Sequence, residues 1–553
     1  MKSNGKVTGY LHTKGRWMVN GNEEPIILRG WAAGNWMNPE GYMIDGIPGM
    51  YGFTDMGGGL VNNIRFDRQR TIAYGVRELA GTQYASTFWQ RWYRAYLSEG
   101  DIRAMAELGY NSVRLVLDGN GFLYEEPGIQ FNEDTFAMLD QVLDWCEQYG
   151  LYAILDLHAA PGGQSGVSCD NGIDNQPHMF TEPESYERTL VLWEEFARRY
   201  KDRWIVGAYE LLNEPVSPPS LRGMSAQLRQ FYEEAIARVR KIDQKHMFIL
   251  EPPAFAHDMA FLDKGFDPEY NNWAYSVHLY WFNPQMSDFY QYLEPSRRLN
   301  VPVWIGEGRG NLADMAVFYD MVAEYGVGFN AFCWKYMRDE EGNANNGLFS
   351  YPMPQGWEKI ARYIDQGGPR PGYEESQKLL DAWIEASCFE NCQTVPLMAE
   401  YTLRRQGITL PAAGYDSEEG SFHGTWREGN IYAYRAEDKI KMVRKEGTPI
   451  PHIFDKPIVG LEHLLVDLRE GEFVTYSVNL VESPAPAKLT GQALKDTTCQ
   501  VTVETTTQTF QWKKGQLLQG EPLLPLVPGA RCGVRIQVER GELLLQSVEF
   551  PLV

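Results

Sequence analysis

The chain has 553 residues, of which 44% are hydrophobic and 22% charged, as expected of a folded globular protein with more than one core. Its 51 basic and 73 acidic residues leave a net charge of −22, which argues against nucleic acid and anionic membrane surfaces as partners. No apolar run approaches the roughly 20 residues that a membrane-spanning helix needs. Residues 1–17 lack the apolar core of a signal peptide, which predicts a cytoplasmic protein.

The seven cysteines are scattered along the chain and odd in number, so they do not predict a disulfide framework. Cys388 and Cys392 are the closest pair. Because no second cysteine pair or histidine cluster lies nearby, we expect two ordinary thiols there and not a zinc site.

Eight short segments rich in β-branched and aromatic residues alternate with longer segments of helical period between about residues 25 and 385. The predicted strands are residues 25–31, 112–118, 151–158, 206–214, 246–252, 273–281, 301–307 and 328–336. This alternation predicts an α/β fold in which residues 1–388 form a (β/α)8 TIM barrel. The sequence favours this barrel over an open doubly wound sheet, because no Gly-rich phosphate loop follows the first strand.

Two further features of the barrel can be read from the sequence. Asn132, and Ser98 with Asp101 three residues on, are predicted to begin two of the helices. Residues 32–97, rich in Gly, Met and aromatic residues, are expected to form a long loop after the first strand. That loop lies on the active rim and is interpreted as lining the site, with a structural plug as the alternative.

After residue 388 the helical period fades, and alternating runs at 430–435, 472–480, 500–512 and 533–550 appear between Gly and Pro residues. They predict that residues 389–553 form a C-terminal all-β sandwich domain. A carbohydrate-binding module is one interpretation of this domain. The preferred one is a packing domain that supports the barrel or a homo-oligomer.

Barrel strands point their carboxyl ends at the catalytic face, and these ends are unusually polar here. They carry Arg114 and Asp118, His158, Asn213 and Glu214, His278 and Tyr280, Glu307, and Trp334. Each one has a structural explanation by itself, such as an ion pair or core packing. Together at one rim they predict a functional site, because every buried polar group must find a partner.

Glu214 and Glu307 follow strands four and seven, on opposite sides of the barrel mouth. Acetal hydrolysis needs two such carboxyl groups: one protonates the leaving oxygen, and the other attacks the anomeric carbon or activates water. A gap of about 5–5.5 Å gives a covalent intermediate and retention, whereas about 6.5–9.5 Å gives inversion. The sequence leaves both outcomes open.

Six motifs occur in one order and at barrel spacing: SVRLVLD (112–118), LDLHAAPGGQSG (155–166), LLNEP (211–215), VHLYW (277–281), IGEG (305–308) and FCWKY (332–336). In this order they resemble glycoside hydrolase family 5, in clan A of retaining (β/α)8 glycosidases. The likeness covers about residues 8–370. The second motif is closest to exo-β-1,3-glucanases. Gly308 and Arg309 depart from the family, most members of which place an aromatic residue after the nucleophile.

The resemblance implies that Glu214 is the acid/base and Glu307 the nucleophile of a double displacement. Arg114 would keep Glu307 ionised, and Glu214 would need a raised pKa, which the charge of Glu307 would supply. Asn213 would bind the sugar 2-hydroxyl. No metal or organic cofactor is implied.

The same resemblance assigns the remaining residues. His278 and Tyr280 would hold the two carboxylates, His158 would bind sugar hydroxyls, and Trp334 would form the floor of the −1 subsite. Selectivity at C2 and C4 of the sugar would depend on loop residues, including Trp36, Asp170, Asn171 and Asn175.

We therefore expect a cytoplasmic retaining β-glycosidase that acts on β-glucosidic bonds of oligosaccharides or small glycosides from the chain end. The alternatives are a β-mannosidase, an endo-acting glucanase or mannanase, and a glycosylceramidase-like hydrolase. A non-catalytic sugar-binding barrel is the alternative from another class of protein.

Overall fold

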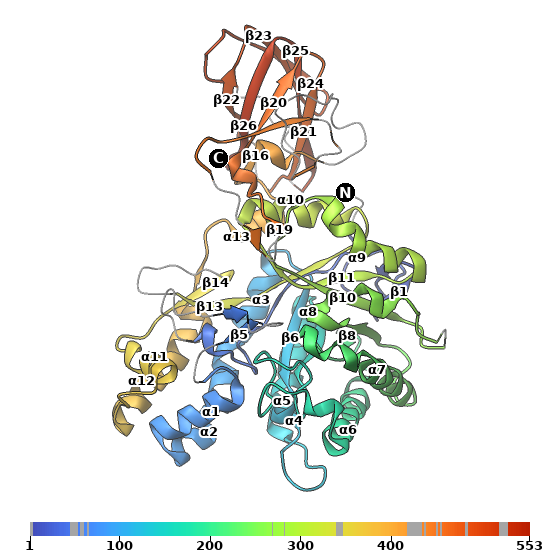
Figure 1. The fold of residues 1–553 in the computed structure, drawn as a ribbon, viewed down its shortest axis with the longest axis vertical. Helices are drawn as coiled ribbons and strands as arrows, with labels where there is room; N and C mark the ends of the chain where they lie inside the picture. The colour runs from blue at the N-terminus through green and yellow to red at the C-terminus, as the bar shows by residue number, and fades with distance from the viewer. Residues whose placement is uncertain are drawn as a thin grey trace.

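The computed structural model describes residues 4–44, 53–55, 60–62, 66–267, 269–280, 282–338, 347–416, 434–435, 438, 440–448, 452–453, 456–481, 485–518 and 529–552. At its centre, eight parallel strands close into a barrel in which each strand pairs with the next along the chain (Figure 1). They are β3 (Arg29–Ala32), β6 (Ser112–Asp118), β7 (Tyr152–Ala159), β8 (Val206–Glu210), β9 (Met247–Leu250), β10 (Trp273–Tyr280), β11 (Val303–Arg309) and β12 (Phe329–Ala331). The predicted (β/α)8 barrel is confirmed.

Three predicted strand limits are wrong by four residues or more, and the others lie within two residues of the structure. The first strand begins at Arg29, because Ile26 instead donates its backbone N–H to Met18 of an N-terminal hairpin. The fourth strand ends at Glu210, so Asn213 and Glu214 lie in the loop beyond it. The eighth strand ends at Ala331, and the chain then forms β13 (Lys335–Arg338), which pairs with β14 (Phe349–Pro352) outside the barrel.

The N-terminal end of the barrel is closed by apolar residues. The hairpin of β1 (His12–Lys14) and β2 (Trp17–Val19) brings Leu11 and Met18 against Tyr152, Met247 and Trp304 in one buried cluster. Since the strand starts are packed in this way, polar chemistry is confined to the opposite end, where the strands terminate.

Helices cover the outside of the barrel. They include α3 (Glu99–Glu107), α5 (Glu133–Tyr149), α6 (Pro183–Tyr200), α7 (Ser225–Arg240), α9 (Met286–Leu299) and α10 (Leu312–Ala323). Asn132 is the N-cap of α5, and Asp101 accepts the backbone N–H of Ser98 at the start of α3, so both predicted helix starts are confirmed. Among the helices of the described ranges, none combines the length and apolar composition needed to cross a membrane.

The segment after the first strand is not simply a loop. It contains α1 (Gln69–Ala80) and α2 (Thr82–Tyr96), which pack against α12 (Tyr373–Ser387) beside the barrel (Figure 1). The ring centroid of Trp92 in α2 lies 4.0 Å from that of Trp383 in α12. The aromatic residues that suggested a loop therefore form the buried face of a helix.

The C-terminal domain consists of two antiparallel sheets. One contains β16 (Ile408–Pro411), β26 (Glu542–Phe550), β20 (Leu464–Arg469), β17 (Lys441–Arg444) and β22 (Lys488–Ala493). The other contains β21 (Phe473–Asn479), β25 (Arg531–Arg540), β23 (Thr497–Val503) and β24 (Thr506–Trp512). Valines and leucines of both sheets share one core, as in a sandwich. The predicted run 430–435 lies mostly outside the described residues, and the domain boundary at residue 388 stays a prediction.

The sandwich stands on the side of the barrel formed by α10 (Figure 1). Arg531 of β25 donates two hydrogen bonds to the carboxylate of Asp320 in α10, at 2.6 and 2.5 Å. Arg404 lies 3.5 Å from the same carboxylate and 2.5 Å from Asp416. Burial raises the pKa of Asp320, but the charges of Arg404 and Arg531 outweigh it and hold that pKa below its usual range.

We predict that Asp320→Asn destabilises the protein by roughly 3–5 kcal/mol at pH 7, because it leaves the largely buried Arg531 without its carboxylate and Arg404 with Asp416 alone. A depressed pKa stabilises the folded state above the unfolded pKa of about 3.9 and loses that effect as pH falls through the folded value. The difference between variant and wild type in urea unfolding should therefore shrink below about pH 4. Asp202→Asn, which removes an exposed carboxylate 2.9 Å from Lys245, should leave the unfolding midpoint almost unchanged.

Candidate active site

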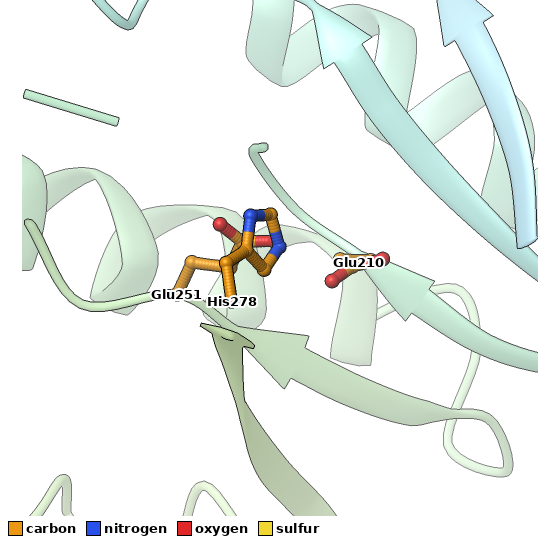
Figure 2. Close-up of side chains that lie close together, drawn as sticks. All are labelled: Glu210, Glu251 and His278. Carbon is orange, nitrogen blue, oxygen red and sulfur yellow. The ribbon is translucent and has the colours of Figure 1, made fainter. Parts of the chain in front are cut away.

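Three neighbouring strands deliver buried ionisable groups to the carboxyl end of the barrel (Figure 2). Glu210 is the last residue of β8, Glu251 directly follows β9, and His278 lies near the end of β10. One ligand atom from each lies within 4.8 Å of the other two. All three residues are buried, so they form a polar layer beneath the mouth of the barrel.

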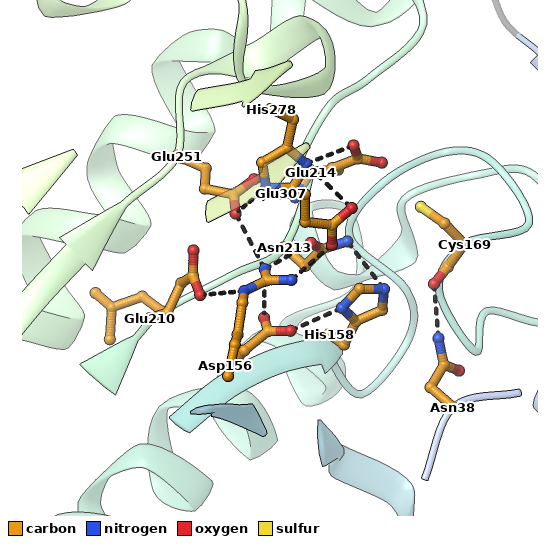
Figure 3. A network of polar contacts seen from close by, with 12 residues as sticks. Asn38, Asp156, His158, Cys169, Glu210, Asn213, Glu214, Glu251, His278 and Glu307 are labelled. Carbon is orange, nitrogen blue, oxygen red and sulfur yellow. Dashed lines mark hydrogen bonds and ion pairs between the residues drawn. The ribbon is translucent and has the colours of Figure 1, made fainter. Parts of the chain in front are cut away.

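Arg114 of β6 is the centre of this layer. Figure 3 labels the residues around it, among them Asp156, Glu210, Asn213, Glu251 and Glu307. Its Nε donates to Glu210 at 2.6 Å, its Nη1 to Glu307 at 2.6 Å, and its Nη2 to Asn213 at 2.8 Å. Its Nη2 also lies 3.2 Å from Asp156 and 3.3 Å from Glu251. Burial lowers the pKa of Arg114, but the surrounding carboxylates raise it well above its usual range, so the guanidinium stays charged.

Glu214 and Glu307 lie above this layer, where both side chains keep some exposure, 12% and 7%. A carboxylate oxygen of one lies within 4.8 Å of a carboxylate oxygen of the other, and His278 Nδ1 is near both. Tyr280 donates to Glu307 Oε2 at 2.9 Å, while Arg114 occupies Oε1. Both oxygens of Glu307 are thus held in place by hydrogen-bond donors.

The backbone holds Glu214 in a constrained position. After β8 ends, Leu211 N–H still bonds Ile249 and Asn213 N–H bonds Leu157, which carries the chain across the mouth. Glu214 then adopts φ 42°, in the left-handed region that is unfavourable for a non-glycine residue. Its N–H donates to Glu251 Oε2 at 2.7 Å, and its carbonyl accepts from Ser217 at 2.6 Å.

The structure contradicts the expected pKa of Glu214. Burial raises that pKa, but the hydrogen bond and charge of His278, 2.7 Å from Glu214 Oε1, outweigh it and bring the pKa below the usual value. Burial lowers the pKa of His278, but the charges of Glu251 and Glu307 and the hydrogen bond to Glu214 raise it well above its usual value. The expectation considered only the repulsion from Glu307; the charged imidazole between the two carboxylates reverses it.

His158 and Asn213 form a second pair at the mouth. His158 Nδ1 lies 2.7 Å from Asp156, and its Nε2 lies 3.3 Å from the amide nitrogen of Asn213. Because the other end of this amide accepts from Arg114, the Asn213 nitrogen is a donor and His158 Nε2 an acceptor. Both residues are therefore oriented by the Arg114 layer, as the prediction of one shared site requires.

Trp334 and Trp36 are not brought into the mouth. Trp334 is completely buried, its indole N–H donates to Asp101 of α3 at 2.9 Å, and its ring packs on Phe349. Trp36 is also completely buried, and its indole N–H donates to the backbone of Tyr93 in α2. Neither ring has the exposure that contact with a sugar needs, so the floor of the −1 subsite assigned to Trp334 and the sugar selectivity assigned to Trp36 are corrected.

Phe332 has a more suitable position than Trp334 for contact with a sugar at the barrel mouth. Its ring is parallel to that of His158, with centroids 6.4 Å apart, and it keeps 7% exposure. Phe332 and Trp334 lie two positions apart in the FCWKY motif, and the eighth strand ends before both of them. The sequence prediction chose the wrong aromatic residue because it continued the strand to residue 336.

The sequence reasoning also missed the carboxylates of the buried layer. Glu251 ends an apolar run in Glu-Pro, as Glu214 does, and that parallel was the available signal. Glu40 was missed too: burial raises its pKa to about 8, the charges of Glu307 and Glu214 adding to this effect. It lies in the segment after the first strand, where Asn38 donates to the Cys169 carbonyl at 2.8 Å (Figure 3).

The loop residues expected to select the sugar are held by protein partners. Asp170 accepts two hydrogen bonds from Ser165, and Asn171 donates to Asp118 at 3.0 Å. Asn175 accepts from Arg68 at 2.6 Å. These contacts shape the loop after β7.

Among the residues that the structure describes, two groups of side chains have the composition of a metal site: Glu210, Glu251 and His278, and Glu214, His278 and Glu307. In both groups Arg114 contacts a carboxylate, and His278 lies against the others. Positive charge is thus already supplied within these clusters by the protein itself.

A closed barrel with two carboxyl groups facing each other over a buried arginine is the arrangement of the barrel glycosidases. Residues 73–338 match the family model for Cellulase (glycosyl hydrolase family 5). This segment of the chain is therefore a glycosyl hydrolase family 5 domain.

Named relatives agree with this family. A β-xylosidase of Phanerodontia chrysosporium is 29% identical over 271 residues, which are 49% of this chain and 52% of that protein. A probable glucan 1,3-β-glucosidase A of Emericella nidulans is 32% identical over 171 residues, or 30% of this chain and 40% of that protein. The chain thus spans about half or less of the length of these relatives. A crystal structure of endogalactoceramidase aligns with 98% of this chain and 100% of its own, at 16% identity and a TM-score of 0.45.

We predict that Phe332→Ala raises KM for aryl β-glycosides about tenfold, because a partly exposed aromatic face next to His158 is lost. Trp334→Phe should instead lower the thermal midpoint, since it removes the donor to buried Asp101, and leave KM within about twofold. Steady-state kinetics and thermal unfolding of both variants separate the two roles. The reverse pattern would restore Trp334 as the sugar platform.

Proposed function

We propose that the chain is a retaining, exo-acting β-glycosidase that hydrolyses β-glucosidic bonds of oligosaccharides or small glycosides. The observation that carries the proposal is the approach of the Glu214 and Glu307 carboxylates to within 4.8 Å. Because the nearest oxygens of the two groups are this close, the arrangement favours the class in which one carboxylate attacks the anomeric carbon directly.

Glu307 is the proposed nucleophile. Arg114 and Tyr280 donate hydrogen bonds to its two oxygens and so orient the carboxylate that attacks the anomeric carbon. Glu214 gives a proton to the departing oxygen as the glycosidic C–O bond breaks and the ester bond to Glu307 forms. Water then cleaves the ester after passing a proton to Glu214, so the product keeps the β configuration.

Glucose is the first choice for the sugar at the −1 subsite, as the similarity to a protein named glucan 1,3-β-glucosidase supports. Xylose is the second candidate, favoured by the similarity to a protein named β-xylosidase over 271 residues. The β-mannosidase and endo-acting alternatives share the same two carboxylates and differ only in how the surrounding loops bind the sugar.

We predict that Glu307→Gly lowers kcat by at least about 10⁴-fold on 4-nitrophenyl β-D-glucoside, β-D-xyloside and β-D-mannoside, because the covalent step is lost. Azide added to this variant should restore turnover and yield the α-glycosyl azide, since the small anion enters on the face vacated by the carboxylate. Equal turnover by variant and wild type would rule out Glu307 as nucleophile. Activity in neither, with sugar binding in calorimetry, would favour the binding protein.

We predict retention and exo action for the wild-type protein. Proton NMR during the first minutes of hydrolysis should show the β anomer before mutarotation, because two displacements invert twice. With a defined β-linked glucose tetramer, monosaccharide should appear from the first time point. Mixed shorter oligomers at early times would favour the endo-acting alternative.

A further inference from the structure

Glu251 is a buried carboxylate that contacts Glu214 directly and is connected to Glu307 through Arg114. Its Oε2 accepts the backbone N–H of Glu214 at 2.7 Å, and its Oε1 lies 3.0 Å from His278 Nε2 and 3.3 Å from Arg114 Nη2. His278 in turn contacts Glu214, and Arg114 contacts Glu307. Glu251 is itself completely buried and lies beneath the mouth, so its role is exerted through these neighbours.

The two nitrogens of His278 each lie against a carboxylate. Nδ1 is hydrogen-bonded to Glu214 Oε1 at 2.7 Å, and Nε2 lies at ion-pair distance, 3.0 Å, from Glu251 Oε1 without the alignment of a hydrogen bond. A neutral imidazole has one N–H donor, so it would leave a lone pair against one of these anions. The doubly protonated imidazolium has a proton for each and is the form that this geometry favours.

We propose that Glu251 is a positioning residue for the acid/base: it holds His278 as an imidazolium and fixes the backbone of Glu214, so that Glu214 and His278 share one transferable proton. This inference rests on the proposed glycosidase function. Glu251 lies outside the predicted catalytic residues.

The proton count of the first step follows from this arrangement. As the glycosidic C–O bond breaks, the departing oxygen takes a proton from Glu214, and Glu214 takes the Nδ1 proton of His278. His278 is left neutral, with its Nε2 proton toward Glu251, and Glu214 is left as the carboxylate that acts as base. The proton that the attacking water gives to Glu214 in the second step restores the imidazolium.

The charge on His278 depends on groups from several strands. Glu214 after β8, Glu251 after β9 and Glu307 of β11 are the carboxylates that face its ring, the last at 3.7 Å from Nδ1. Glu210 of β8 lies within 4.8 Å of the ring nitrogen and of Glu251. Arg114 of β6 opposes these charges. Tyr280, which lies on β10 like His278, donates a hydrogen bond to Glu307.

The test variant is Glu251→Gln, which keeps the shape and removes the charge. Because one negative charge beside the shared proton is lost, that proton should dissociate at lower pH. The basic limb of the kcat/KM profile should move down by about 1 pH unit or more. At pH 7, kcat/KM for a methyl or phenyl β-glycoside should fall by at least about 30-fold, whereas a 2,4-dinitrophenyl glycoside, whose leaving group needs no proton, should lose less than about threefold.

Glu210→Gln is the matched control. It changes another buried carboxyl group, 2.6 Å from Arg114, without the contact to the Glu214 backbone. Its pH limb should move clearly less than that of Glu251→Gln, because Glu210 is hydrogen-bonded to Arg114 and not to the Glu214–His278 pair, and its two leaving groups should be affected equally. Equal losses on both leaving groups in Glu251→Gln would overturn the proposal and assign Glu251 to support of Arg114 and Glu307.

A second measurement needs neither activity nor a stable Glu251 variant. Nitrogen NMR of ¹⁵N-histidine-labelled wild-type protein, assigned with His278→Gln, should show both nitrogens of His278 protonated at pH 7. A neutral His278 would overturn the proposal even if every variant failed to fold. Absence of glycoside hydrolysis in wild type, together with a charged His278, would reject the proposed function separately.

Discussion

The guanidinium of Arg114 lies completely buried among four carboxylates, and the carboxyl end of the barrel is organised around it. Removing these charges from water is costly, and only good geometry with nearly every donor used can offset that cost. The planar fork of arginine has five N–H donors in fixed directions, which a lysine could not provide. Through them one side chain of β6 joins groups from β7, β8, β9 and β11.

The barrel therefore has two polar layers with different tasks. The lower one, with Glu210 and Glu251 around Arg114, is buried and excludes water. Burial raises the pKa of Glu210 to about 7, with Glu251 acting in the same direction and Arg114 against it, so this layer already limits its own negative charge. The upper layer, Glu214 and Glu307, keeps partial exposure and receives its orientation from below.

The sequence was sufficient for the barrel and for the residues that project from regular strand ends. Arg114, His158, His278 and Glu307 lie on strands, so an alternating pattern places them correctly. It failed where the chain leaves the strand. Glu214 reaches its position through a left-handed backbone conformation. Phe332 and Trp334 lie beyond the early end of the eighth strand. Neither feature produces a periodic hydrophobic pattern from which the sequence could predict it. The protonation of Glu214 depends on His278, a contact between residues 64 positions apart.

The sandwich domain takes part in this organisation through the loop that follows β10. Asn283 donates to the Pro457 carbonyl at 2.9 Å and accepts from Val459 N–H at 2.9 Å, while Gln285 accepts from Arg435 N–H at 2.6 Å. That loop begins beside Tyr280, whose hydroxyl holds Glu307. These contacts hold Asn283 and Gln285 against the sandwich domain. These contacts favour a packing role for the sandwich, because a domain tied to the barrel by buried arginines and by this loop is built to hold one geometry.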